Sequence, residues 1–331
     1  MYDVSVIIPT LNRRELLREV IQSLWAQTLA PDRFEVIVVD NCSTDGTEDI
    51  MRDAIADSPC RLRYHRMPRN LGAVRSRNTG ARMAEAPLLA FTDSDCRVTA
   101  KWLETALKNF ANDPEVAFLT GPVHNKPNQP VKFFTVGSVE TAGENPVYPT
   151  CNIVYRADVF WSVGGFDEGV YLGDVLGLSV ESADIDLAWR LKDAGLKNNF
   201  VEELVVQHEV RQVSPMEWLL AHYCRVALIP EMLRRHPRLK PAFLWWGPFC
   251  VADNFFFYIA VLGALLAALL NSWFVVAVIP FVGRMARVVK PSPSPLGIAK
   301  LVTQIFFLTT RQALLCGSLV YGSIRARRLV L

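Results

Sequence analysis

The first 95 residues alternate between short apolar runs and stretches with helical spacing, and this alternation constrains the fold more than any other feature. Near-continuous apolar runs are typical of strands that are buried on both faces of a sheet. Strands that alternate with helices over short loops predict a parallel sheet with right-handed crossovers and helices on both faces. The predicted fold class is therefore α/β. The first predicted strands cover residues 4–10, 34–39, 62–65 and 88–91.

The alternation becomes less regular after residue 95. Residues 170–180 show no clear period, and a loop rich in Pro and Asn covers residues 122–130. Further helices are predicted over residues 102–110 and 184–194, and further strands over 116–120, 152–155 and 200–207.

Two carboxylates separated by one residue, Asp93 and Asp95, stand just after the apolar run that ends at Phe91. Asp is depleted in strands, and an uncompensated charge is costly to bury. Open α/β sheets bind ligands at the carboxyl ends of their strands. Carboxylate oxygens suit Mg²⁺ or Mn²⁺, which proteins usually share with substrate phosphates. The pair therefore indicates a metal site, and the alternative is a polar turn that caps a helix near Ala100.

The C-terminal part differs from the rest in charge and hydropathy. Residues 1–210 carry a net charge of −9 and residues 211–331 a net charge of +11. The basic part is rich in Phe, Leu and Val, so an anionic membrane surface fits it better than nucleic acid. The seven cysteines show no CxxC spacing, which favours free thiols in a reducing cytosol.

Residues 242–282 are almost wholly apolar. This length suits two membrane spans of about 20 residues each, and the turn is predicted at Asn271-Ser272, with Gly263 as the alternative. Basic residues on both flanks indicate that both ends face the cytosol, so the segment is predicted to be a hairpin. The alternative is a buried helical hairpin of a soluble domain. Residues 216–235 are predicted to be one basic helix, and residues 298–324 a helix that lies in the membrane interface or packs against the hairpin.

Four segments in the first half of the chain, residues 4–13, 36–47, 70–80 and 91–95, resemble the successive motifs of family 2 glycosyltransferases with the GT-A fold. They read VSVIIPTLNR, VIVVDNCSTDGT, NLGAVRSRNTG and FTDSD. The resemblance extends over roughly residues 3–210. It implies transfer of a sugar from a nucleotide diphosphate sugar, with inversion at the anomeric carbon and with Mg²⁺ or Mn²⁺ as cofactor.

The resemblance implies roles for residues around the carboxylate pair. Asp95 would hold the metal, and Asp93 would lie nearer the ribose and be a second candidate ligand of the metal. His208, at the end of a predicted strand, matches a position that supplies a third metal contact in many relatives. The alternative for His208 is an ordinary surface histidine.

The nucleotide would be bound by residues on the first loops. Thr10 and Asn12 lie on the first loop, and Asp40 matches the residue that accepts a hydrogen bond from the base. The alternative for Asp40 is an N-cap of the next helix. Arg75 and Arg77 lie in the segment that faces the nucleotide in relatives, and Arg77 is favoured. The alternative is that both arginines are solvated helix positions.

Inversion also needs a base that removes the proton of the acceptor hydroxyl. Relatives place it in a Glu-Asp pair that opens a helix, and Asp184 matches the base. Ala183 replaces the Glu of the pair, and Glu181 could fold back into its position. Asp186 is the alternative base. Asp184 and Asp186 could also be acids favoured in a first helical turn by the helix dipole.

These predictions divide the chain into a catalytic domain and a C-terminal membrane-associated part. The catalytic domain covers residues 1–212, with a nucleotide-binding half over 1–97 and an acceptor half over 98–212. A basic linker helix over 213–241, a membrane hairpin over 242–283, a linker over 284–297 and an amphipathic helix over 298–331 follow.

The predicted protein is a membrane-associated glycosyltransferase with its catalytic domain in the cytosol, at a plasma membrane or inner membrane. Its acceptor would be lipid-linked, such as a polyprenyl-diphosphate sugar for a surface glycan. The Gln-x-x-Arg-Trp motif of processive synthases is absent after His208, which favours a single transfer. The alternatives are a transferase on a soluble or protein acceptor whose tail serves oligomerisation, and a non-catalytic nucleotide-sugar-binding subunit of a membrane complex.

Overall fold

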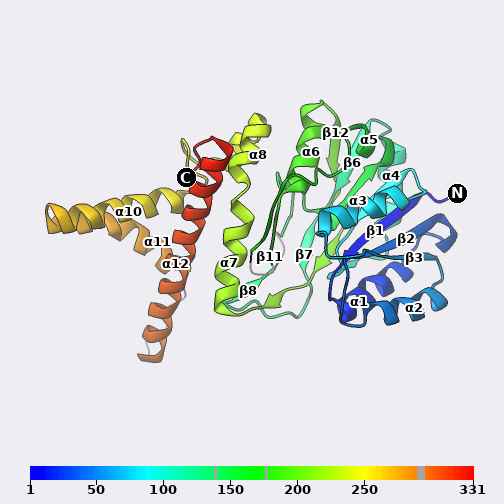
Figure 1. Cartoon of the computed structure of the whole chain (residues 1–331), viewed down its shortest axis with the longest axis horizontal. Helices are drawn as coiled ribbons and strands as arrows, with labels where there is room; N and C mark the ends of the chain where they lie inside the picture. The colour runs from blue at the N-terminus through cyan, green and yellow to red at the C-terminus, as the bar shows by residue number, and fades with distance from the viewer. Residues whose placement is uncertain (138–139, 176–177, 289–294) are drawn as a thin grey trace. The chain divides into compact units, whose positions relative to one another are not determined.

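The computed structural model describes residues 1–137, 140–175, 178–288 and 295–331, which form two compact units (Figure 1). The first unit comprises Met1–Val131, Val136–Val170 and Ala183–Arg211. The second comprises Lys132–Thr135, Tyr171–Ser182 and Gln212–Leu331. Two short segments from the middle of the chain thus belong with the C-terminal part.

A seven-stranded sheet forms the centre of the first unit, in the order β12-β6-β9-β4-β1-β2-β3. Strand β9 is antiparallel to both its neighbours, and the other neighbouring strands pair in parallel. This arrangement confirms the predicted α/β class with a mostly parallel sheet. The strands are β1 (Val4–Thr10), β2 (Phe34–Asp40), β3 (Arg61–Arg66), β4 (Leu88–Phe91), β6 (Val116–Thr120), β9 (Ile153–Arg156) and β12 (Lys197–Phe200).

Helices cover both faces of this sheet. Alternate residues of a strand point to opposite faces. On β2, Val36 and Val38 join the apolar core that contains Leu17 of α1 and Met51 of α2, whereas Ile37 and Val39 pack on the other face, toward α3. The helices of this unit are α1 (Arg14–Trp25), α2 (Thr47–Asp57), α3 (Ala73–Met83), α4 (Trp102–Asn112), α5 (Ala157–Ser162) and α6 (Ala183–Asp193), with 3₁₀ turns η1 (Pro31–Arg33) and η2 (Thr150–Asn152).

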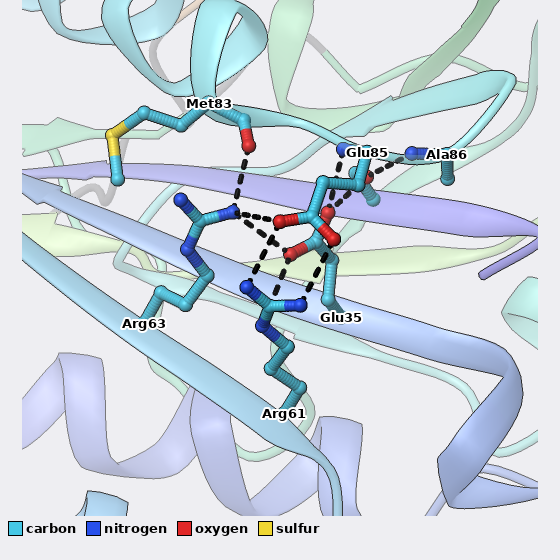
Figure 2. Close-up of polar contacts among 7 residues, drawn as sticks. Glu35, Arg61, Arg63, Met83, Glu85 and Ala86 are labelled. Atoms are coloured by element: carbon cyan, nitrogen blue, oxygen red, sulfur yellow. Dashed lines mark hydrogen bonds and ion pairs between the residues drawn. The ribbon is translucent and has the colours of Figure 1, made fainter. Parts of the chain in front are cut away.

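A buried ionised cluster lies at the amino end of β2 (Figure 2). Glu35 is fully buried. Its Oε1 accepts hydrogen bonds from Ser5 Oγ and from the Glu85 N–H, each at 2.8 Å, and its Oε2 pairs with Arg63 Nη1 at 3.2 Å. Because these partners satisfy the carboxylate, the charge is tolerated inside the fold. The cluster therefore stabilises the edge of the sheet opposite the carboxyl ends of the parallel strands.

A second, three-stranded sheet consists of β5 (Cys96–Val98), β13 (Val206–His208) and β7 (Val123–Asn125). Strand β13 is central, antiparallel to β5 and parallel to β7. The predicted single strand over 200–207 is therefore wrong, because β12 ends at Phe200 and β13 begins at Val206. A turn closed by the Leu204 N–H and the Val201 carbonyl separates the two strands.

The second unit is mainly helical. Its elements are the antiparallel pair β10 (Tyr171–Val175) and β11 (Leu178–Glu181), then α7 (Pro215–Val226), α8 (Ile229–Arg235), η3 (Pro237–Leu239), α9 (Lys240–Phe243), α10 (Ala252–Leu269), η4 (Ser272–Val278), α11 (Ile279–Val288) and α12 (Pro295–Ala326). The chain passes between the units within the short strands β8 (Thr135–Val136) and β14 (Arg211–Gln212). The single helix predicted over 216–235 is wrong, because α7 ends at Val226 and α8 begins at Ile229. Pro230, in the first turn of α8, lacks the N–H that a continuous helix needs.

The apolar hairpin differs from its prediction in its second arm. Among the described residues, one helix, α10, is long and apolar enough to cross a membrane. The returning chain consists of η4 and α11, and Pro280 stands in the first turn of α11. The prediction of two helical spans is therefore wrong for residues 272–282, because a chain that restarts at a proline does not continue the preceding helix.

The two arms nevertheless lie side by side (Figure 1). A Cβ added at Gly263 of α10 would lie 2.5 Å from Ala277 Cβ and 2.8 Å from the Phe274 carbonyl oxygen, so the glycine permits close packing of η4. At the base of the hairpin, Arg284 Nε donates to Asp253 Oδ1 at 2.5 Å. The 30 residues between Asp253 and Arg284 in the sequence carry no charge.

Candidate active site

The pairing of β5 with β13 brings together two predicted site residues. Asp95 directly precedes β5, and His208 ends β13 opposite Cys96. The Glu209 N–H donates to the Asp95 carbonyl oxygen at 3.0 Å, which extends the ladder by one bond. As a result, His208 Nε2 lies 3.4 Å from Asp95 Oδ1, although 113 residues separate the two in sequence. The Asp95 carboxylate is 4% exposed.

The donor atoms of this pair fit a divalent cation. His208 Nδ1 lies 2.8 Å from the Glu209 carbonyl oxygen, which can only accept, so Nδ1 is the nitrogen that donates, and in the neutral ring the lone pair is on Nε2. Asp95 Oδ1 is buried and has no hydrogen-bond partner within the described ranges. Two acceptor atoms thus face each other, and a cation between them would satisfy both.

Cys96 lies beside this pair but contributes differently. Its Sγ belongs to the same cluster of possible ligand atoms, which all lie within 4.8 Å of one another. Burial raises the pKa of the Cys96 thiol well above its ordinary value, and the neighbouring Cys151 acts in the same direction. Because a thiol binds metals as the thiolate, Cys96 is a poor ligand here, and the Asp95 carboxylate and the His208 imidazole remain as donors for a divalent cation.

Arg13 also contacts the Asp95 carboxylate, and sequence reasoning assigned it no role. Its Nη1 donates to Asp95 Oδ2 at 2.5 Å, and its side chain is 37% exposed. The guanidinium therefore neutralises one carboxylate oxygen while the other faces His208. The signal that could have identified Arg13 is its position as the last residue of the first motif, at the exit of β1.

Arg77 and Asp93 form a second ion pair at this edge of the sheet. Arg77 Nη2 donates to Asp93 Oδ1 at 2.8 Å, and the two side chains are 9% and 22% exposed. Burial alone would raise the pKa of Asp93, but the Arg77 charge outweighs it and holds that pKa below its ordinary value. Arg75, the other predicted arginine, lies apart from this pair and donates from Nε to Glu168 Oε2 at 3.0 Å.

The predicted nucleotide-side residues meet where β1 and β2 end. Thr10 and Asp40 are register partners at the last position of these strands. Thr10 is buried, and its Oγ1 has no hydrogen-bond partner in the described part of the chain. Asp40 Oδ1 accepts from the Ser43 N–H at 2.8 Å, which orders the loop rather than the first turn of α2. Asn12 has φ +51° and joins the same loop, because its Oδ1 accepts from the Thr44 N–H at 2.7 Å.

The two candidate bases occupy different environments on α6. Asp186 is 1% exposed, and its Oδ2 accepts from Arg190 Nε at 2.7 Å. Arg190 also donates to the Gly165 carbonyl oxygen at 2.7 Å, so this pair ties α6 to a loop. Asp184 is only half-buried. Glu181, which was expected to compensate for Ala183, belongs to the second unit, so that expectation stays a prediction.

Asp184 is electrostatically linked to the core below the carboxylate pair. Burial and the Asp184 charge together raise the pKa of the Tyr155 hydroxyl. The Tyr155 ring meets the Phe91 ring edge-on, with centroids 6.0 Å apart. Phe91 is the last residue of β4, two positions before Asp93. The Asp184 charge therefore acts on a tyrosine whose ring packs against the last residue of β4.

Comparison with known proteins agrees with this fold. A family model described as "Glycosyl transferase family 2" matches residues 5–164. The validoxylamine A glucosyltransferase of Streptomyces hygroscopicus subsp. limoneus is 29% identical over 281 residues, which cover 73% of this chain and 58% of that protein. The pre-mycofactocin glycosyltransferase of Mycobacterium tuberculosis is 28% identical over 248 residues, which cover 71% of this chain and 48% of that protein. The chain thus spans only about half of the length of these relatives.

Among solved structures, the mannosyltransferase PcManGT from Pyrobaculum calidifontis, in complex with GDP-Man and Mn²⁺, is similar in fold. Its TM-score is 0.59 at 20% sequence identity, and the match covers 99% of this chain and 88% of that one. The predicted motifs, the sheet order and the family match agree with one another. Residues 5–164 match glycosyl transferase family 2, and the chain has the GT-A fold of its structural neighbours.

Proposed function

We propose that this protein is an inverting, metal-dependent glycosyltransferase that uses a nucleotide diphosphate sugar. The observation that carries the proposal is the Asp95–His208 pair, in which a buried carboxylate oxygen and an imidazole nitrogen both present lone pairs across 3.4 Å. The proposal is supported by the family and by relatives described as glucosyl- and glycosyltransferases. The neighbour with bound GDP-Man and Mn²⁺ supports the donor class and the kind of metal.

The mechanism has two parts, the departure of the diphosphate and the attack of the acceptor hydroxyl, and different residues serve each. Asp95 and His208 would hold a Mg²⁺ or Mn²⁺ ion, which would supply Lewis-acid neutralisation of the departing diphosphate. Arg77 places a buried positive charge at the same edge and keeps Asp93 ionised, so that Asp93 can accept hydrogen bonds from a ribose. Thr10, Asn12 and Asp40 line the strand ends where the base and ribose would lie.

Asp184 takes the proton of the acceptor hydroxyl as that oxygen attacks the anomeric carbon from the side opposite the diphosphate. Asp184 is favoured over Asp186 because Asp186 already forms a buried ion pair with Arg190. A base that is held in such a pair is a weaker proton acceptor, since the guanidinium stabilises its ionised form.

The acceptor is proposed to be lipid-linked, at the cytosolic face of a plasma or inner membrane, in the synthesis of a surface glycan. The net charge of +11 over residues 211–331 and the uncharged stretch between Asp253 and Arg284 support a membrane-bound tail. Exposed apolar side chains concentrate on the hairpin, with Leu269 and Trp273 more than three-quarters exposed. A large exposed apolar surface of this kind indicates an interaction site.

The test uses the full chain in detergent with a panel of nucleotide diphosphate sugars, first for Mn²⁺-dependent thermal stabilisation and then for transfer to polyprenyl-diphosphate acceptors. Stabilisation by one donor followed by metal-dependent transfer would support the proposal. Transfer only to a soluble or protein acceptor would favour the alternative acceptor class. Donor binding with no transfer to any acceptor would favour a non-catalytic subunit.

A further inference from the structure

The chain around His208 is held by a loop that the proposed mechanism does not use. The loop follows β7 and contains Lys126 and Gln129. The Lys126 N–H donates to the His208 carbonyl oxygen at 2.9 Å, beyond the last pair of the β7–β13 ladder. Lys126 Nζ, on a side chain that is 8% exposed, pairs with Glu209 Oε2 at 3.0 Å and with Glu19 Oε2 at 2.7 Å. The buried ammonium thus anchors the loop to the residue that follows His208.

Gln129 contacts the two residues after His208 with both ends of its amide. Its Nε2 donates to Glu209 Oε1 at 2.6 Å, and its Oε1 accepts from the Val210 N–H at 2.8 Å. A carboxylate can only accept and a backbone N–H can only donate, so these partners require this amide orientation. A carboxylate or an apolar side chain at position 129 could not make both bonds.

The bond to Val210 determines where the Glu209 carbonyl points. The peptide that joins Glu209 to Val210 is planar and trans, so its C=O and N–H point in opposite directions. Gln129 holds the N–H on one side, and the carbonyl oxygen on the other side lies 2.8 Å from His208 Nδ1. That carbonyl keeps the proton on Nδ1 and the lone pair of Nε2 toward Asp95 Oδ1. Partners of this kind set the tautomer and orientation of metal-binding histidines.

We propose that Gln129 is a positioning residue that sets the tautomer and orientation of His208 through the Glu209–Val210 peptide. The reason for positioning His208 rests on the proposed metal-dependent function, but the positioning itself needs no metal. Loss of the Gln129 amide frees the peptide to rotate, and His208 then samples both tautomers. The neutral ring presents its Nε2 lone pair to a cation only in the tautomer that carries the proton on Nδ1.

The first experiment measures Mn²⁺ binding by electron paramagnetic resonance in the full chain and in Gln129→Leu. A loss of affinity of about 10- to 100-fold is expected, as for other residues that orient metal ligands. Gln27→Leu is the matched control, because Gln27 Nε2 donates to the Thr99 carbonyl oxygen at 2.8 Å and its Oε1 accepts from the Leu103 N–H at 3.0 Å. This control should lower the melting temperature and leave Mn²⁺ affinity unchanged.

The second experiment reads the tautomer without metal, from ¹⁵N shifts of labelled imidazoles. The protein has five histidines, and the His208 signal is the one that disappears from the spectrum of His208→Asn. The wild type should show the proton on Nδ1 of His208, and Gln129→Leu should show a mixture of tautomers. If Gln129→Leu fails to fold, Gln129→Asn keeps the amide but is one methylene too short for both bonds, and it should change the spectrum in the same direction.

The two readouts separate this inference from the proposed function. A wild-type proton on Nε2, or a Gln129→Leu variant that melts lower but keeps wild-type tautomer and Mn²⁺ affinity, would overturn the role of Gln129. A wild type that binds no Mn²⁺, but whose His208 tautomer still depends on Gln129, would overturn the metal-dependent function and leave the positioning role intact.

Discussion

The two aspartates of α6 offer the sharpest contrast between neighbouring side chains. Asp184→Asn should lower transfer by about 10²- to 10⁴-fold, the usual contribution of a general base, without weakening nucleotide binding. Asp158→Asn is a matched control, because Asp158 is an exposed acid in the first turn of α5. Rates and nucleotide affinities of both variants would be measured on the same donor and acceptor. Equal activity in Asp184→Asn and wild type would remove Asp184 as the base.

Asp186→Asn should instead affect stability. The change leaves the Arg190 guanidinium without its ionised partner in a buried site, which costs on the order of 3 kcal/mol of the free energy of unfolding. Chemical denaturation measures this loss. If Asp186→Asn proved as stable as wild type but inactive, the assignments of the two aspartates would have to be exchanged.

The Arg13 guanidinium shares the Asp95 carboxylate with the proposed metal. Arg13→Gln removes a positive charge beside the site and should strengthen Mn²⁺ binding by roughly 2- to 5-fold, the effect expected for a partly exposed charge. Arg14→Gln is the control, because the neighbouring Arg14 pairs with exposed Glu15. Calorimetric titration with Mn²⁺ alone checks the result. Weaker binding in Arg13→Gln would show that Arg13 holds Asp95 in place rather than competing with the ion.

At the scale of the element, Gly263 permits the close packing of η4 on α10. Gly263→Ala would place a Cβ 2.5 Å from Ala277 Cβ, so the arms must separate and the melting temperature in detergent should fall by several degrees. Gly283→Ala is the matched control, because no described atom outside its own turn lies within 4 Å of a Cβ there. The control should be neutral or slightly stabilising, since Ala favours helix over Gly.

Helix α8 should contribute a pH-dependent term to stability. Hydrogen bonds from Arg234, opposed by burial and aided by Arg235, lower the pKa of Glu231 to about 2 from its ordinary 4.5. Because the folded-state pKa is the lower one, this stabilisation is complete above pH 4.5 and is lost as the pH falls toward 2. Glu231→Gln should therefore cost roughly 1 kcal/mol at pH 6 and progressively less below pH 4.5. Thermal unfolding of both proteins across this range measures the difference, and a pH-independent penalty would contradict it.

The elements that the sequence predicted well share one property: they are local. The apolar runs that became β1, β2 and β4 are buried throughout, which leaves a continuous signature in the sequence, whereas β3 is partly exposed and its signal is weaker. Asp40, Asp93 and Asp95 could be selected as candidate site residues because each stands at the end of such a run. The strand over 200–207 was misassigned because apolar residues (Val201, Leu204 and Val205) stand on both sides of Glu202 and Glu203 in the turn that separates β12 from β13.

The parts that escaped prediction depend on pairs that are distant in sequence. Arg13 meets Asp95 from 82 positions away, and Lys126 meets Glu19 from 107 positions away. Such pairs are set by the order of strands in the sheet, which single-sequence periodicity does not encode. The same holds for residues 171–182, whose strands belong to the second unit although their neighbours in sequence belong to the first.

For the whole molecule, the charge division predicts how the full chain meets a bilayer. The protein should float with vesicles that contain anionic lipid and much less with zwitterionic vesicles, and salt should weaken the association. Trp273→Asp introduces a charge into the uncharged stretch and should reduce binding at least tenfold, because a charge in the hydrocarbon costs about 2.5 kcal/mol or more. Ile55→Asp, at an exposed apolar position of α2, is the matched control. Equal flotation of the two variants would contradict a membrane role for the hairpin.

The membership of residues 132–135 in the second unit has a practical consequence for the preparation of a soluble fragment. Phe133 and Phe134 both contact the Trp218 ring, and Phe134 also meets Phe307 of α12 edge-on at 4.9 Å. A truncation that removes α12 removes Phe307, and a cut before α7 removes both Trp218 and Phe307. Either truncation therefore leaves aromatic side chains uncovered on the shortened protein. Such fragments should aggregate on expression even if every catalytic residue is present. Replacing Phe133 and Phe134 with polar residues would be the first change to make in a shortened expression clone.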